Sequence, residues 1–146
     1  MPAYTAAAAA LGQELTVPEV AQSIVLTRMS MKSTGMPAGE TLENFGRTGT
    51  TLAIHLGIRA LREIERQLSP HYGADCPVAV VYRVGWPDQR IIRGTLTDIR
   101  EKVRAAKITR TALILLGPAL SDQNGFPDSA LYDAAKPHIL RPKAKV

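Results

Sequence analysis

A run of almost purely apolar residues, Pro77–Tyr82, constrains the fold more than any other feature of the sequence. It lacks the polar alternation of a strand that faces water on one side, so we expect a central strand that is covered on both faces. A second run of this kind spans residues 111–116 and ends at Gly117-Pro118. Strands of this type occur where helices cover both faces of a sheet, which favours an α/β fold.

Shorter patterns predict the remaining strands. Residues 23–27 and 51–56 are apolar, rich in β-branched residues and end at or before turn residues. Residues 89–95 follow Pro77–Tyr82 after a short turn, so we expect these two strands to be antiparallel neighbours. Together the strands and helices predict a mixed-sheet α/β layer sandwich in a single domain without an internal repeat.

Helices are predicted between these strands. Residues 3–11 form a small-residue helix that Gly12 ends, and residues 40–45 form a single turn. Apolar residues recur at helical spacing from Ile58 to Leu68, and we expect Ser69-Pro70 to end that helix. Thr97 is the expected cap of a further helix that carries Ile99 and Val103 on one face.

Length, cysteine content and apolar runs narrow the class of protein. The 146 residues, 45% of them hydrophobic, suit one globular domain, and the single Cys76 cannot form an internal disulfide, which favours a reducing compartment. Residues 4–11 are too short to cross a membrane, and no Lys or Arg precedes Arg28, so a charged signal-peptide start is missing. We therefore expect a cytoplasmic protein without a membrane partner.

Positive charge increases along the chain. The formal net charge is +5, and the excess lies in the last third of the sequence. Such a surface either favours a polyanionic partner or is simply solvated, since Arg and Glu alternate in residues 62–66. Aromatic residues make up only 5% of the chain, and no RNA-binding sheet or helix–turn–helix pattern is present. A nucleic-acid partner is therefore not expected.

Residue chemistry alone predicts neither a catalytic group nor a metal site. His55, His71 and His138 are far apart in sequence and fit neither a triad nor zinc-ligand spacing. The segment 46–51 superficially resembles a phosphate-binding loop but lacks its lysine and its preceding strand, so a simple turn is favoured. His55 lies near a strand end, where either a binding role or a buried, hydrogen-bonded imidazole is possible.

Several motifs resemble the C-terminal half of tetrapyrrole methylases. The most specific is the turn Trp86-Pro87-Asp88-Gln89 at the centre of residues 76–96, which is typical of the branch that methylates carbon 11 of precorrin-4. The further matching segments are residues 15–20, 25–28, 36–40, 51–56, 111–114 and 131–133. The resemblance extends from residue 2 to about residue 142.

The resemblance implies transfer of a methyl group from S-adenosylmethionine to carbon 11 of precorrin-4, in cobalamin biosynthesis. An activated sulfonium donor demands positioning rather than acid–base chemistry, which agrees with the missing triad. The acceptor carries acetate and propionate arms, so arginines are the expected clamps, and Arg28 and Arg83 are the candidates.

Residues of the methyl-donor pocket are carried over from the family by motif position. The family usually has Ala or Gly at the position of Val84 and often Met at that of Leu56, so both are departures in this sequence. The implied donor-pocket residues are Pro2, Ala3, Leu56, Val84, Thr111 and Ala112.

The resemblance also carries expectations about the whole protein. Residues 1–146 are expected to be a C-terminal tetrapyrrole methylase domain without the N-terminal half and its glycine-rich loop, and to be inactive alone. Met1 stands where the family has Val, so we expect a GUG codon inside a longer gene, or else a gene that is split or truncated. Relatives are homodimers, and a homodimer is expected here. The alternatives are methylation of another tetrapyrrole, or a non-catalytic module for dimerisation or ligand binding.

Overall fold

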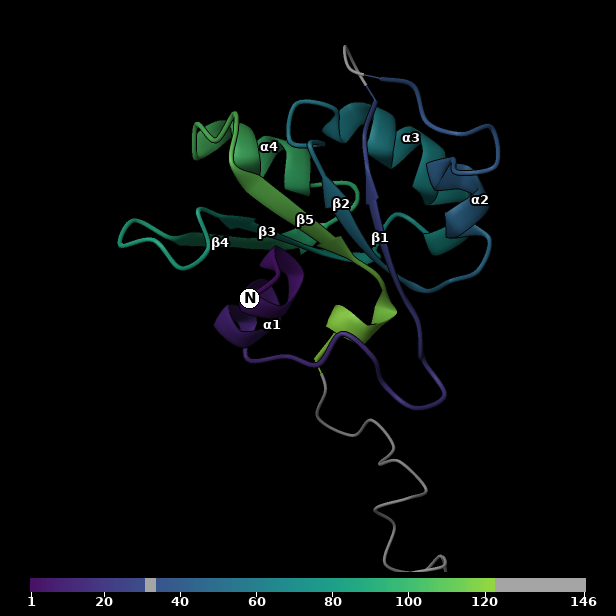
Figure 1. Ribbon diagram of the computed structural model, residues 1–146, viewed down its shortest axis with the longest axis horizontal. Helices are drawn as coiled ribbons and strands as arrows, with labels where there is room; N and C mark the ends of the chain where they lie inside the picture. Colours follow the sequence, from purple (N-terminus) through teal and green to yellow (C-terminus); the bar gives the residue numbers. More distant parts are fainter. Residues whose placement is uncertain (31–33, 123–146) are drawn as a thin grey trace, which may run out of the picture.

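The computed structural model describes residues 1–30 and 34–122, and residues 131–133 of the resembling motifs and His138 lie outside these ranges. The described chain forms a five-stranded sheet between helices (Figure 1). Its elements in chain order are α1 (Ala3–Leu11), β1 (Ile24–Arg28), α2 (Leu42–Gly46), β2 (Thr51–His55), α3 (Leu61–Tyr72), β3 (Pro77–Tyr82), β4 (Arg90–Thr95), α4 (Ile99–Ala105), β5 (Ala112–Leu116) and the 3₁₀ turn η1 (Pro118–Leu120).

The sheet is mixed, as the sequence predicts, and its strand order is β1-β2-β5-β3-β4. β1 runs parallel to β2, whereas β5 is antiparallel to both of its neighbours, β2 and β3. β3 and β4 form the expected antiparallel pair, with Tyr82 opposite Arg90 beside the turn. The carboxyl ends of β1, β2 and β3 therefore lie at one edge of the sheet, where β5 begins.

Helices cover the two faces of the sheet unequally. α2, α3 and α4 lie on one face, and α1 lies on the other (Figure 1). The apolar strand β5 contributes side chains to the core on both faces of the sheet. Ile114 packs on the side of α3, and Leu113 and Leu115 pack on the side of α1. This division explains why β3 and β5 lack polar alternation: neither face of either strand meets water.

Two predictions of helix ends are wrong. α3 continues through Pro70 to Tyr72, because a proline in the last turn removes a single N–H donor and Gly73 N–H still donates to the Ser69 carbonyl (2.9 Å). Thr97 does not cap α4, since its hydroxyl donates to the Ala74 carbonyl (3.0 Å) and Asp98 precedes the helix instead. The predicted end of α1 is confirmed, with Gly12 in the left-handed region at φ 63°.

Candidate functional site

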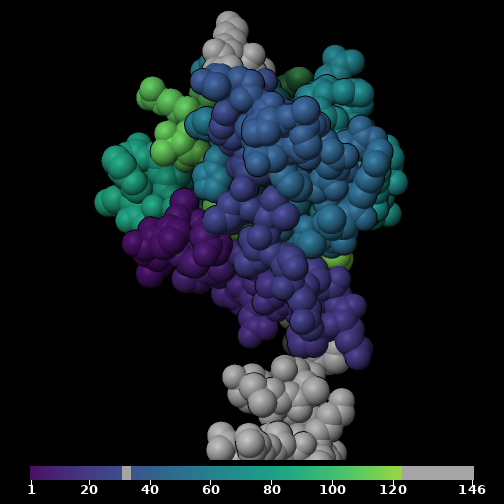
Figure 2. Space-filling view, turned by 45° about the vertical axis from the view of Figure 1, so that its right-hand side comes forward, coloured from purple at the N-terminus to yellow at the C-terminus, as the bar shows by residue number. Residues whose placement is uncertain are grey.

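A hollow of about 480 Å³ lies at the edge of the sheet where β2 and β3 end and β5 begins. Its walls come from the start of α1 and from the segments next to these three strand ends. Figure 2 shows the start of α1 in purple, the β3–β4 turn in teal and the segment before β5 in green next to one another on the surface. Small-molecule sites of α/β proteins commonly have this size and this position. We refer to the hollow as the strand-end cavity.

Most residues that the family resemblance implies for the donor pocket lie on this cavity. Pro2 is not among its lining residues and stands next to them as the N-cap of α1. The donor contact itself remains a prediction for all six. The five that line the cavity are Ala3, Leu56, Val84, Thr111 and Ala112.

Three cavity residues have left-handed backbones. Leu56, Arg83 and Thr111 have φ values of 54°, 46° and 53°, and each lies directly beside a strand end. Side chains with a Cβ rarely adopt this conformation, and strain of this kind concentrates at functional sites. Arg83 N–H donates to the Thr111 carbonyl (2.9 Å), and this backbone hydrogen bond links two of the three residues between the end of β3 and the start of β5. The backbone therefore turns sharply where the cavity opens.

Arg83 lies on the cavity wall within a set of internal contacts. Its guanidinium is 4.2 Å from the centre of the Trp86 ring and forms an ion pair with Asp88 (2.9 Å). The turn is closed by hydrogen bonds from Trp86 N–H to the Arg83 carbonyl (3.0 Å) and from Gly85 N–H to Gln89 Oε1 (2.8 Å). The Trp-Pro-Asp-Gln motif thus orients Arg83, and the side chain remains 30% exposed.

Arg28 is not among the residues that line the cavity. It ends β1, opposite His55 in register, and its Nη2 donates to the Thr34 carbonyl (2.9 Å). The structure therefore does not bring the two candidate substrate arginines onto one wall. For His55 the sequence left open a binding role or a buried, hydrogen-bonded imidazole, and the structure has features of both. The residue lines the cavity, and its Nδ1 lies 3.0 Å from the Thr27 carbonyl oxygen.

The sequence did not identify Trp86, Arg59 and Arg110 as cavity residues. Trp86 is 56% exposed and lines the cavity wall beside Arg83. Their positions in the sequence could have indicated them, because each of the three follows the end of a predicted strand or precedes the start of one by a few residues. In the described ranges the cavity lining contains arginines and no carboxylate, so its apolar walls carry positive charge. Such a site suits a ligand with an apolar body and anionic groups.

Metal ligands and membrane spans were also sought in the described ranges. Residues 1–30 and 34–122 contain no group of three or more His, Cys, Asp or Glu side chains that could hold a metal ion. Within the same ranges no helix has both the length and the apolar character to cross a membrane.

Comparisons with known proteins agree with the family resemblance. The chain is 56% identical over 135 residues to a precorrin-4 C(11)-methyltransferase of Sinorhizobium sp, an alignment that covers 92% of this chain and 53% of the relative. An X-ray structure of a cobalt precorrin-4 methyltransferase matches with a TM-score of 0.76 and 35% identity, covering 80% of this chain and 48% of that one. A uroporphyrin-III C-methyltransferase from Thermus thermophilus, in complex with S-adenosylhomocysteine, has the same fold at 22% identity (TM-score 0.62; 80% and 50% covered).

The chain spans about half the length of the curated relatives that it matches. The family model for tetrapyrrole (corrin/porphyrin) methylases matches residues 1–100, which is more than half of the chain. The predicted fold and family are therefore confirmed: the chain belongs to the tetrapyrrole (corrin/porphyrin) methylase family.

Proposed function

We propose that this chain supplies the C-terminal domain of an S-adenosylmethionine-dependent methyltransferase that acts at carbon 11 of precorrin-4 or of its cobalt form. The observation that carries the proposal is the convergence of five expected donor-pocket residues on the strand-end cavity. The identity of 56% to a relative with this activity supports the substrate. Because the chain spans about half of that relative, a complementary half is part of the proposal.

The strand-end cavity fits the donor in size and character. Its volume of about 480 Å³ lies within the usual range of small-molecule sites, and Leu56, Val84 and Ala112 offer apolar surface to an adenosine group. The donor supplies an activated methyl group when bound. This chain's part is to bind and orient it, and positioning of two reactants alone contributes several kcal/mol to a barrier reduction.

Positive charge at the mouth of the cavity supports an anionic acceptor. Arg83 and Arg110 line the same hollow, and guanidinium groups bind carboxylates with two parallel hydrogen bonds. Trp86 adds an exposed aromatic surface next to Arg83, which suits a flat macrocycle. An acetate or propionate arm would compete with Asp88 for the Arg83 guanidinium.

The proposal also includes the assembly and the compartment of the enzyme. We expect the complete enzyme to be a homodimer in the cytoplasm. The single, buried and free Cys76 suits a reducing compartment. Light scattering on the reconstituted enzyme tests the dimer.

Reconstitution tests the activity. The chain is co-expressed with the N-terminal half of the Sinorhizobium relative and supplied with precorrin-4 and S-adenosylmethionine labelled in the methyl group. We expect the label at carbon 11 of the product by NMR, and no product from either half alone. Label at another ring carbon would replace the substrate assignment, and a well-formed complex without any product would contradict the proposal.

A further inference from the structure

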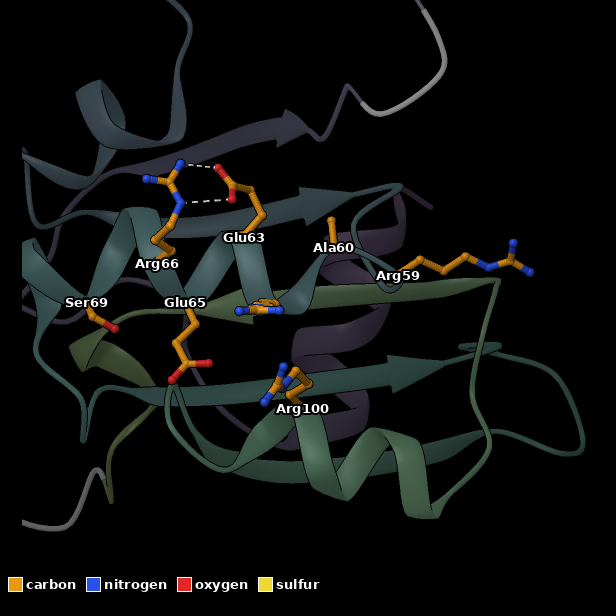
Figure 3. A pocket seen from close by; sticks show the side chains of 8 residues that line it. Arg59, Ala60, Glu63, Glu65, Arg66, Ser69 and Arg100 are labelled. Carbon is orange, nitrogen blue, oxygen red and sulfur yellow. Dashed lines mark hydrogen bonds and ion pairs between the residues drawn. The ribbon is translucent and has the colours of Figure 1, made fainter.

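A groove lined by arginines runs between α3 and α4, outside the strand-end cavity. One hollow of about 650 Å³ and an adjoining one of about 460 Å³ share Arg59, Arg62 and Arg100. Figure 3 shows Arg100 and Glu65 extending into the space between the two helices, and Arg59 at the end where β5 begins. We refer to these hollows, with Arg59, Arg62, Arg100 and Arg104, as the arginine groove.

The charges of the arginine groove are incompletely balanced. Glu63 and Arg66 also line the larger hollow, but they form an ion pair with each other (Figure 3), and this contact lowers the pKa of the Glu63 carboxyl to about 2. Glu65 is then the remaining carboxylate in the lining. Within the described part of the chain, no ion pair joins Arg62 or Arg100 to a carboxylate. An anion between α3 and α4 would relieve the repulsion of these guanidinium groups.

The floor of the groove is apolar. Leu61 of α3, Val103 of α4 and Ile108 line the smaller hollow. All three are buried in the core cluster on this face of the sheet. The groove thus combines an apolar surface with planar cationic groups, which suits a macrocycle that carries carboxylate arms.

The groove is continuous with the strand-end cavity. Ile58, Arg59 and Thr109 line both the cavity and the smaller hollow of the groove, and Arg59 lines all three hollows. Arg59 is fixed at this junction, because its Nε donates to the Thr109 carbonyl (3.0 Å). Within residues 1–30 and 34–122 its other N–H groups form no hydrogen bond or ion pair, so they can bind an anion at either side.

We propose that the arginine groove binds the carboxylate arms of a tetrapyrrole outside the cavity for methyl transfer and leads it there past Arg59. The inference rests on the proposed function, because that function supplies the polycarboxylate ligand. The groove is the outer binding site, and Arg59 is the point at which it joins the cavity.

Uroporphyrin, a stable porphyrin with acetate and propionate arms, is the probe for this site. Its fluorescence is titrated with the full chain, with Arg62→Gln, with Arg100→Gln and with the double variant. Exposed ion pairs contribute modestly, so we expect a loss of roughly threefold in affinity for each single variant and about tenfold for the double variant. Coproporphyrin, which lacks the acetate arms, should bind the wild type more weakly than uroporphyrin does. Its affinity should also fall less in the arginine variants.

Arg47→Gln is the matched control. It removes the same charge from an exposed residue that follows α2, which packs near Leu68 and His71 at the opposite end of α3 from Arg59. Its uroporphyrin affinity should change less than twofold. Circular dichroism establishes that each variant is folded.

The outcomes separate the groove from the proposed function. Equal uroporphyrin affinity in the wild type, the double variant and Arg47→Gln would refute tetrapyrrole binding at the arginine groove. Full displacement of uroporphyrin by inorganic phosphate at matched ionic strength would refute it as well. S-adenosylhomocysteine binding, measured on the same proteins, should be unchanged by the groove variants. A different result is that uroporphyrin affinity falls in the groove variants as expected while the reconstituted complex binds no S-adenosylhomocysteine. Tetrapyrrole binding at the arginine groove would then be supported, and the proposed methyl-transfer function would be refuted.

Discussion

The left-handed backbone at Leu56 predicts an unusual order of stability between two variants. Leu56 has φ 54° and its residue is 69% exposed, so replacement by Ala or by Gly removes the same, mostly solvated side chain. With a Cβ present, this conformation is unfavourable by about 1–2 kcal/mol, which Gly avoids. Gly in turn loses about 0.5–1 kcal/mol more conformational entropy on folding. We therefore expect Leu56→Gly to be more stable than Leu56→Ala by about 0.5–1 kcal/mol.

Urea unfolding of the two variants measures this difference, with the free energy of unfolding obtained by linear extrapolation. The control is Ala9, an exposed residue in the last turn of α1, where Ala9→Gly should destabilise the protein by about 0.5–1 kcal/mol. The preference for Gly thus reverses between positions 56 and 9. If Leu56→Ala is as stable as Leu56→Gly, the strain attributed to the cavity backbone is absent.

Three further predictions concern other parts of the fold. Arg83→Ala should weaken uroporphyrin binding several-fold and leave S-adenosylhomocysteine affinity unchanged in titrations of both; unchanged uroporphyrin affinity would remove Arg83 from the acceptor site. Thr51→Val should lower the free energy of unfolding by about 1–3 kcal/mol in urea, because the buried hydroxyl donates to the Leu15 carbonyl (2.6 Å), and a neutral effect would refute that bond. Burial raises the pKa of the Cys76 thiol from 9.0 to about 11, so ionisation of the unfolded thiol should lower stability as pH rises above 9, by up to about 1.4 kcal/mol per pH unit. Unfolding between pH 9 and 10 should show a steeper slope in the wild type than in Cys76→Ala; the slope that remains in the variant comes from Tyr72, whose pKa burial raises from 10.0 to about 12.

The architecture could be predicted because hydrophobic pattern and sheet position are closely coupled here. Pro77–Tyr82 and residues 112–116 are apolar on both faces, and the structure buries both between α1 and the α2–α4 layer. The ends of α3 and α4 were predicted less well. Proline in a last turn is tolerated when the next N–H groups still find carbonyls, and Thr97 bonds across to Ala74, a contact between distant segments that local pattern does not contain.

The cavity could be predicted in part. Motif position identified Leu56, Val84 and Ala112, whose places at strand ends are local properties of the chain. Trp86 and Arg59 were missed because their place depends on how the β3–β4 turn and the start of α3 fold back over the sheet edge. Arg28 shows the converse: it ends β1, which runs parallel to β2, yet β1 lies outside the strands whose ends line the cavity.

Donor binding at the strand-end cavity is the central claim, and a single cavity-filling substitution tests it. Ala3 is exposed at the first turn of α1 and lines the cavity, so Ala3→Trp should fill the cavity without entering the core. Ala9→Trp places the same side chain on an exposed position of the same helix, away from the cavity, and is the control.

Calorimetric titration of S-adenosylhomocysteine into the complex of this chain with the N-terminal half of the Sinorhizobium relative is the decisive measurement. The account predicts that S-adenosylhomocysteine binds to the wild type and to Ala9→Trp. It predicts at least a tenfold loss of affinity for Ala3→Trp, and a tenfold loss corresponds to about 1.4 kcal/mol of binding free energy. Equal affinity in all three folded proteins would contradict it.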